Sequence, residues 1–230
     1  MGSRREIEGW IAAGRVSVNG RLAKLGDRAG PTDSILVDGK PVAAPSKAAP
    51  RVLLYHKPVG ELVTRSDPEG RRTVFSQLPP GRWIAVGRLD LNSSGLLLLT
   101  DSGELANRLM HPRFGLEREY LARVRGELNP AELARLRQGI LLDGVPARFE
   151  RIEGHRQGEG ANRWYRVVLQ EGRNREVRRL FEELGHPVSR LSRLRYGPVE
   201  LPPDLGPGKW RELPAKAVNG LFRQGDTDKL

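Results

Sequence analysis

The chain of 230 residues carries 39 Lys and Arg against 28 Asp and Glu, a formal net charge of +11, and is 38% hydrophobic. This composition is typical of one large or two small globular domains, and it excludes a disordered chain and a membrane-spanning run. The lack of cysteine excludes disulfides, thiolate catalysis and Cys-ligated metal sites, and because no segment reads as a signal peptide the expected location is the cytoplasm. The positive charge predicts an anionic partner, most commonly a nucleic acid.

The first 42 residues are typical of a small helix-plus-hairpin module. Ser3 and Glu6 form a capping-box pair ahead of a helix that is expected to end at Gly14. A stretch rich in Ala, Pro and Ser over residues 43–50 predicts a linker, so the predicted domains span 1–42 and 51–230. Two dipeptides within the module are typical of tight hairpin turns, Asn19-Gly20 and Asp38-Gly39.

Residues 51–230 mix strand and helix patterns, which indicates an α+β fold with an antiparallel or mixed sheet. Pro130 at a first helical position, with Asn129 before it and Glu132 after it, starts one helix. A second helix is expected over residues 174–184, with Gly185 as its stop. The expected strands are 52–55, 83–86, 96–100, 120–124, 149–152 and 164–169.

A charged pair stands beside an apolar strand in the first part of this domain. The four leucines 96–99 can be buried on both faces of a sheet, which places Asp90 in a loop leading into the core, with Arg88 two residues away. Burial raises the pKa of a carboxyl group unless a guanidinium holds the group ionised. From the residues alone, the pair is either part of a reactive site or an ion pair that only fixes the loop.

Metal and nucleotide sites find little support in the sequence. Asp90, Asn92, Ser94 and Asp101 match positions of a calcium-binding loop, but an apolar strand follows in place of a helix and the twelfth position is not Glu. The four histidines have no i, i+4 partner, and no Gly-x-x-x-x-Gly-Lys-Ser/Thr motif occurs. We therefore expect no metal and no cofactor.

The densest basic region lies between residues 163 and 195. On the expected helix over 174–184, a buried stripe is predicted, with Arg175 and Arg179 facing outward either as nucleic-acid contacts or as a solvated face. Arg178 lies beside the apolar stripe and needs a carboxylate partner, for which Asp90 is available. The stripe consists of Val177, Leu180, Phe181 and Leu184.

Four sequence blocks follow one another along the chain: Tyr55-His56-Lys57-Pro58-Val59-Gly60, Gly87-Arg88-Leu89-Asp90, the segment 101–120 ending in Glu117-Arg118-Glu119-Tyr120, and Glu171-Gly172-Arg173-Asn174-Arg175-Glu176-Val177-Arg178. In this order they resemble the bacterial ribosomal RNA pseudouridine synthases of the small-subunit and large-subunit uridine synthase branch. Within that branch the chain is most similar to the group B enzymes of the large subunit. The resemblance implies a catalytic domain with a mixed, mostly antiparallel sheet, preceded by an alpha-L RNA-binding module over 1–42.

The resemblance implies a role for each matching residue. Asp90 is similar to the family's nucleophile, and either Arg88 or Arg178 would keep its carboxylate ionised. Tyr120 matches the active-site tyrosine, suited to stacking on uracil and to proton transfer. Leu191 resembles the leucine that lines the substrate pocket, and Lys57 is either a further pocket residue or one that shapes a turn.

The implied substrate is ribosomal RNA, either 23S RNA itself or a large-subunit assembly intermediate. The protein is expected to act as a monomer, with no membrane and no metal as partner. Arg173, Arg175 and Arg179 are expected to bind phosphates near a flipped uridine. Arg4 and Arg5 belong to the module expected to bind an adjacent RNA helix. The module is expected to lack the first helix of its family, so that Met1 is an internal methionine or the chain is truncated.

Two alternatives stay open from the sequence. The same chemistry could act on another ribosomal RNA site, including one in 16S RNA. The chain could also be a ribosomal RNA-binding or assembly protein without catalytic activity, in which case Asp90 has no chemical role.

Overall fold

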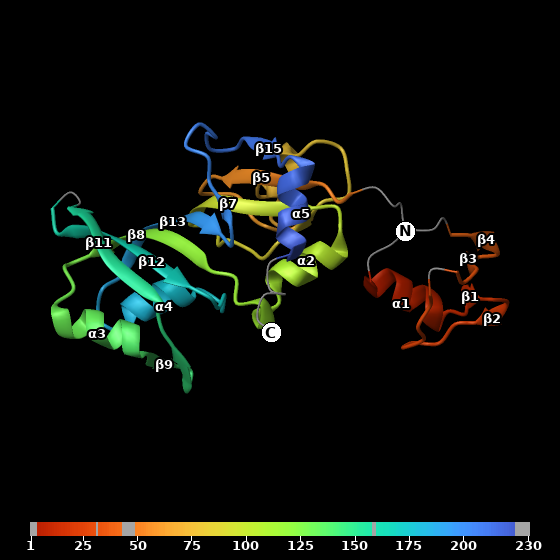
Figure 1. Cartoon of the computed structure of the whole chain (residues 1–230), viewed down its shortest axis with the longest axis horizontal. Helices are drawn as coiled ribbons and strands as arrows, with labels where there is room; N and C mark the ends of the chain where they lie inside the picture. Colours follow the sequence, from red (N-terminus) through yellow and green to blue (C-terminus); the bar gives the residue numbers. More distant parts are fainter. Residues whose placement is uncertain (1–3, 31, 43–48, 158–159, 224–230) are drawn as a thin grey trace. The chain divides into compact units, whose positions relative to one another are not determined.

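The structure is a computed structural model that describes residues 4–30, 32–42, 49–157 and 160–223. The chain divides into two units, Met1–Ala48 and Ala49–Leu230 (Figure 1). Most of the predicted linker, residues 43–48, lies outside the described residues, as does Ser3 of the predicted capping box.

The first unit combines helix α1 (Arg4–Ala12) with a four-stranded antiparallel sheet in the order β2-β1-β3-β4. Asn19 and Gly20 (φ 48° and 80°) form one two-residue turn, and Asp38 and Gly39 (φ 51° and 73°) form another. Both predicted hairpin turns are confirmed, since tight hairpins need positive φ at both central residues. The strands are β1 (Val16–Val18), β2 (Arg21–Leu22), β3 (Ile35–Val37) and β4 (Lys40–Pro41).

The second unit is built on a nine-stranded sheet. Seven strands follow the order β11-β12-β8-β13-β7-β5-β15, while β14 pairs with β13 and β6 pairs with β7. Only the β13–β7 pairing is parallel within this sheet as described, so the predicted α+β class with a mixed, mostly antiparallel sheet is confirmed. The strands are β5 (Val52–Lys57), β6 (Ile84–Ala85), β7 (Ser93–Thr100), β8 (Arg118–Arg125), β11 (Arg151–Gln157), β12 (Asn162–Leu169), β13 (Val188–Tyr196), β14 (Val199–Glu200) and β15 (Trp210–Glu212).

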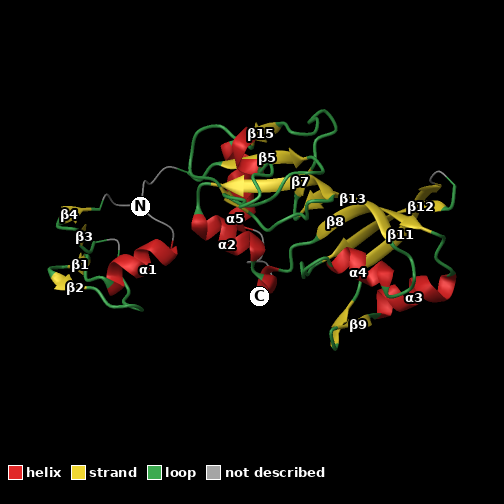
Figure 2. Ribbon diagram, turned by 180° about the vertical axis from the view of Figure 1, so that it is seen from behind, coloured by secondary structure: helices red, strands yellow, loops and turns green. Residues whose placement is uncertain are grey.

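Helices cover the sheet in two pairs, as Figure 2 shows from behind. Helices α3 (Pro130–Gln138) and α4 (Glu176–Glu182) pack their apolar residues into one core, and α2 (Gly103–Met110) and α5 (Ala215–Arg223) pack theirs into a second core. No helix in the described ranges is long and apolar enough to cross a bilayer. The remaining elements are the 3-10 turns η1 (Val74–Gln77) and η2 (Pro112–Phe114) and a hairpin of β9 (Ile140–Leu142) and β10 (Val145–Ala147).

Strands β5 and β7 explain the run of four leucines. Leu97 and Leu99 belong to the core under α3 and α4, whereas Leu96 and Leu98 belong to the core under α2 and α5. Side chains alternate between the two faces of a strand, so a strand covered on both faces is apolar throughout. The predicted burial of this run on both faces is confirmed, and it makes β7 a rigid support for the loop that precedes it.

Some expected elements match the structure and others differ from it. The helix at Pro130 is confirmed, with a capping box between Asn129 and Glu132. The helix expected over 174–184 is shorter, because Arg175 has a left-handed φ of 52°. The strand expected at 149–152 starts at Arg151 instead, after Phe149 and Glu150 bond to neighbouring elements. The sequence analysis missed α2, α5, the β9–β10 hairpin, β13, β14 and β15.

Candidate active site

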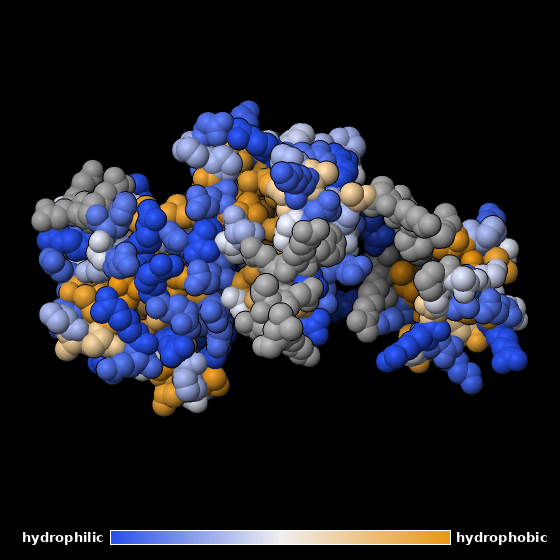
Figure 3. Space-filling view, in the orientation of Figure 1, coloured by the Kyte–Doolittle hydropathy of each residue, from blue (hydrophilic) through white to orange (hydrophobic). Residues whose placement is uncertain are grey.

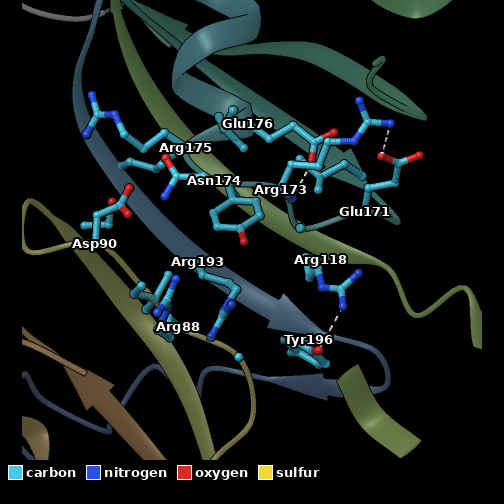
Figure 4. A pocket seen from close by; sticks show the side chains of 18 of the residues that line it. Arg88, Asp90, Arg118, Glu171, Arg173, Asn174, Arg175, Glu176, Arg193 and Tyr196 are labelled. Atoms are coloured by element: carbon cyan, nitrogen blue, oxygen red, sulfur yellow. Dashed lines mark hydrogen bonds and ion pairs between the residues drawn. The ribbon is translucent and has the colours of Figure 1, made fainter. Parts of the chain in front are cut away.

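A cavity of about 940 Å³ opens in the second unit, where the loop before β7 meets β8, β13 and the segment before α4 (Figure 4). Its wall carries both apolar and charged side chains, a combination typical of ligand sites. No three His, Asp or Glu side chains come together in a metal-binding arrangement within the described ranges. The predicted site residues on the wall are Arg88, Asp90, Tyr120, Arg173, Arg175 and Leu191.

The loop that carries Asp90 is held by hydrogen bonds to its backbone carbonyls. Ser93 N–H donates to Asp90 O at 3.0 Å and Gly60 N–H donates to Leu91 O at 2.9 Å. The Asp90 side chain is 35% exposed, so its carboxylate faces the cavity while its backbone stays fixed. This arrangement holds the Asp90 carboxylate on a rigid support.

The buried side chain of Lys57 bonds to the backbone of the same loop. Its side chain is 0% exposed, and Nζ donates to Pro58 O, Asp90 O and Ser93 O at 2.9, 3.1 and 2.8 Å. Burial lowers the pKa of Lys57 to about 8, against the opposing charges of Glu61 and Asp90. The structure places Lys57 beneath the loop and not on the cavity wall, which supports its interpretation as a residue that shapes the turn.

Arg178, on α4, is the arginine that approaches the Asp90 carboxylate. Its Nε lies 4.0 Å from Asp90 Oδ2, while Nη2 donates to Asn92 O and Ser93 Oγ and Nη1 donates to Val188 O. Among the described residues, Arg178 Nε has no hydrogen-bond partner, so it is free to bond to Asp90 after a small movement. Burial lowers the pKa of Arg178, but an arginine stays protonated in proteins.

Arg88 occupies a different place from Arg178. It is exposed at the cavity wall, and within the described part of the chain it forms no ion pair with Asp90. Of the two arginines that the sequence leaves open, Arg178 is the one that the structure places within 4.0 Å of the Asp90 carboxylate.

A glycine sets the spacing between the two central strands. Gly95 on β7 lies opposite Arg193 on β13, and it has a φ of +105°. A Cβ at this position would lie 2.2 Å from Arg193 O and 2.5 Å from Arg193 N, so no other residue fits without a shift of the backbone. The close approach places the start of β7, and hence Asp90, beside β13.

Strands β8 and β13 present the apolar and aromatic part of the wall. Tyr120 and Leu191 are both buried and line the cavity, and their cross-strand partners are Arg193 and Ala122. Tyr120 thus lies directly opposite Arg193, and Leu191 lies on the same face of the sheet, two residues before Arg193 on β13. The arrangement provides an aromatic ring and an aliphatic side chain in the cavity that also holds Asp90.

The arginines predicted to bind RNA fall into different environments. Arg175 is exposed at the cavity wall, whereas Arg173 lines the wall but pairs with Glu171 at 2.6 Å and donates to Val145 O and Pro146 O. Arg179 lies off the wall and pairs with Asp143.

Arg173 and Arg179 therefore both hold the β9–β10 hairpin, at whose surface hydrophobic residues show in Figure 3, with Leu141 and Val145 exposed. In the first unit, Arg5 is exposed on α1, and the side chain of Arg4 lies outside the described part of the chain.

Three wall residues escaped the sequence analysis: Arg118, Arg193 and Tyr196. All three are buried, although the first two carry charge. A period of two would place Leu191, Arg193 and Arg195 on one face of a strand. The register shift between Arg193 and Arg195 puts Arg195 opposite Glu119, on the other face, so the sequence pattern does not single out Arg193.

Comparison with known proteins gives matches over most of the chain. The family model for RNA pseudouridylate synthase matches residues 51–183, and that for the S4 domain matches residues 1–35. Ribosomal large subunit pseudouridine synthase B of Pseudomonas aeruginosa is 52% identical over 229 residues, which are 97% of this chain and 59% of that protein. The protein of the same name from Escherichia coli K12 is 55% identical over 96% of this chain and 78% of its own length.

A solved structure also matches both units. The crystal structure of a pseudouridylate synthase aligns with a TM-score of 0.68 and 25% identity, covering 95% of this chain and 94% of that one. The range 51–183 contains the sequence blocks around Lys57, Asp90, Tyr120 and Arg178.

Proposed function

This chain belongs to the RNA pseudouridylate synthase family, and we propose that it isomerises a uridine of 23S ribosomal RNA to pseudouridine, with Asp90 as the reacting carboxylate. The family predicted from the four sequence blocks is thereby confirmed. The observation that carries the proposal is the Asp90 carboxylate on the cavity wall, 4.0 Å from the buried Arg178. The name of the relatives supports the large subunit as the source of the substrate.

The chemistry needs one ionised carboxylate near the ribose. The C1′–N1 bond of uridine breaks, the base turns, and a C1′–C5 bond forms, after which C5 loses a proton and N1 carries one. A carboxylate beside C1′ can attack that carbon or assist removal of the C5 proton. Arg178 lies 4.0 Å from the Asp90 carboxylate and can orient it toward the ribose. The rearrangement conserves all atoms and electrons, so it needs neither a redox step nor a cofactor.

The cavity wall suits a uracil that has left the RNA stack. Tyr120 offers an aromatic ring for stacking and Leu191 an aliphatic contact. An enzyme that acts on a base inside a helix must extrude that nucleotide into its pocket. Arg88 and Arg175, exposed at the wall, can bind the RNA on either side of the extruded nucleotide.

The first unit supplies a second RNA contact in this proposal. Its match to the S4 domain and the exposed Arg5 on α1 support binding of an adjacent RNA helix by shape and backbone. Arg173 and Arg179 have a smaller part as phosphate ligands, since both are already engaged with the β9–β10 hairpin.

Position-resolved pseudouridine mapping of unmodified ribosomal RNA, incubated with the purified protein without added cofactor, tests the proposal. We expect one new pseudouridine in 23S RNA, which Asp90→Asn abolishes. Asp204→Asn is the matched control, because Asp204 is exposed and pairs with Arg211 away from the cavity wall. A product in 16S RNA would correct the substrate, and tight binding without product would favour the binding-protein alternative.

The same proposal leads to expectations about the cellular location and the oligomeric state of the protein. Ribosomal RNA is modified where ribosomes assemble, so we expect a cytoplasmic monomer acting on naked RNA or on a large-subunit assembly intermediate. Cell fractionation and sedimentation of the purified protein check both expectations, and modification of intermediates at different stages shows when the protein acts.

A further inference from the structure

Two buried arginines lie against one tyrosine ring in the cavity wall. The Cζ atoms of Arg118 and Arg193 lie 4.9 and 5.0 Å from the centroid of the Tyr196 ring. The exposed fractions are 8% for Arg118, 2% for Arg193 and 1% for Tyr196, and all three line the cavity (Figure 4). The cluster is therefore part of the wall although it is almost closed to bulk solvent.

The pairing of β8 with β13 brings these residues together. Arg118 lies opposite Tyr196, and Tyr120 lies opposite Arg193, so one patch of the sheet carries both arginines and the aromatic ring of the proposed uracil site. The patch is fixed from behind, since Tyr196 OH donates to Leu109 O at 2.9 Å.

The hydrogen bonds of the two guanidinium groups are only partly satisfied. Arg118 donates to Leu116 O, Gln170 O and Tyr196 OH, and Arg193 Nε donates to Leu96 O at 2.7 Å. Arg193 Nη2 is buried and has no hydrogen-bond partner among the described residues.

Neither guanidinium forms a close ion pair within the described ranges. The buried carboxylate of Glu176 lines the same cavity and interacts with the charge of Arg118, but its hydrogen bond comes from Arg173 N. Arg193 has no carboxylate partner among the described residues. By contrast, Arg195 on the same strand pairs with Glu117 and Glu119 at 2.7 and 3.1 Å. Arg193 of β13 and Arg118 of β8 are thus buried without the ion pairs that Arg195 forms.

A buried cation without a counter-charge is unfavourable, and carbonyl oxygens and an aromatic ring offset its charge only in part. An anion that enters the cavity supplies the missing charge. It also supplies an acceptor for Arg193 Nη2, which is buried in the structure and becomes accessible when the side chain turns toward the cavity. A guanidinium matches a phosphate with two parallel hydrogen bonds, whereas a neutral uracil carbonyl offers an acceptor without the charge.

We propose that Arg193, assisted by Arg118, forms a phosphate subsite in the cavity wall that binds one RNA phosphate next to the extruded uridine. The inference rests on the proposed function for the identity of the polyanion. It adds a residue that binds the RNA backbone inside the cavity, directly opposite the tyrosine that faces the base.

The test is the salt dependence of RNA binding by Arg193→Gln in an Asp90→Asn background, which keeps the RNA unmodified. Loss of one phosphate contact should lower the slope of log affinity against log salt by about 0.7–0.9. The affinity ratio of parent to variant should then shrink about threefold between 50 and 200 mM salt. Arg195→Gln is the matched control, with the same change of charge on the same strand but off the cavity wall, and its slope should equal that of the parent.

A second measurement keeps the inference testable if Arg193→Gln fails to fold. RNA with a single neutral methylphosphonate linkage, moved along the strand around the target uridine, should weaken binding to the parent at one linkage beside that uridine. Arg193→Lys, which keeps the charge, should retain the salt slope but bind more weakly.

The outcomes separate this inference from the proposed function. Pseudouridine formation with an unchanged slope for Arg193→Gln, or a scan without any sensitive linkage, overturns the phosphate subsite alone and leaves Arg193 as a residue that holds Leu96 O. Lack of pseudouridine with the unaltered protein overturns the proposed function, while a slope that still falls by one phosphate supports the subsite for bound RNA.

Discussion

Replacement of Gly95 by alanine should destabilise the second unit and the site together. The new Cβ would lie 2.2 and 2.5 Å from Arg193 O and N, and these backbone atoms cannot rotate away as a side chain can. The φ of +105° adds a cost of about 1–2 kcal/mol for a residue with a Cβ. Overpacking of a closely packed region adds about 1–3 kcal/mol, so we expect the free energy of unfolding to fall by about 3 kcal/mol.

Urea unfolding of Gly95→Ala and Gly208→Ala measures this effect. Gly208 has a comparable φ of +75°, but nothing lies within 4 Å of its virtual Cβ, so its replacement should cost only about 1–2 kcal/mol. Separation of β7 from β13 would also move Asp90 relative to Arg178, and a displacement of about 1 Å should slow pseudouridine formation about 100-fold. Equal destabilisation by the two variants would refute the claim that close strand approach requires glycine.

Further predictions address the charges of Arg178, Lys57 and Asp143. Arg178→Lys cannot reproduce the bonds to Asn92 O and Val188 O and should lower kcat about 100-fold with little change in KM, as steady-state kinetics would show; an unaltered kcat contradicts the role of Arg178. Activity should fall as pH rises above about 8, because neutral Lys57 has two N–H groups for three carbonyls, and a pH–rate profile that stays flat to about pH 9.5 contradicts this. In the folded protein the pKa of Lys57 is about 8, below its ordinary value of 10.5, so between these pH values the unfolded chain binds more protons than the folded chain. The contribution of Lys57 to stability should therefore rise with pH across that window, which urea unfolding at several pH values checks. Asp143→Asn should release Arg179 and raise RNA affinity about threefold at low salt, since an exposed pair contributes little to folding; unchanged affinity in a filter-binding assay would show that Arg179 binds no phosphate.

Local patterns in the sequence were sufficient for the elements that depend on few residues. Asn19-Gly20 and Asp38-Gly39 form the turns that their type favours, and Asn129, Pro130 and Glu132 start a helix with a complete capping box. The alternation of the leucines before Thr100 between two cores follows from the period of a strand. For the turns and the helix start, the interactions that decide the conformation join residues close together in the chain, whereas the leucine run only indicates a strand that other segments cover on both faces.

The sequence also determined the family, because the four blocks contain residues of specific chemical types in a specific order. It did not determine how those residues are used. Arg88 is two residues from Asp90 in the sequence, yet Arg178, which follows 88 residues later, is the one that approaches the carboxylate. That pairing depends on α4 packing against the loop before β7.

Burial of charge was decided only by the tertiary structure. In the sequence Lys57 is part of a turn motif. Its burial becomes possible because the carbonyls of Asp90 and Ser93, more than 30 residues away, accept hydrogen bonds from its Nζ. In the sequence Arg193 resembles the many surface arginines, yet the pairing of β13 with both β8 and β7 places its side chain in the cavity wall. Hydrogen-bond partners for a buried cation come from distant segments, so no local pattern of residues can show which arginine or lysine leaves the solvent.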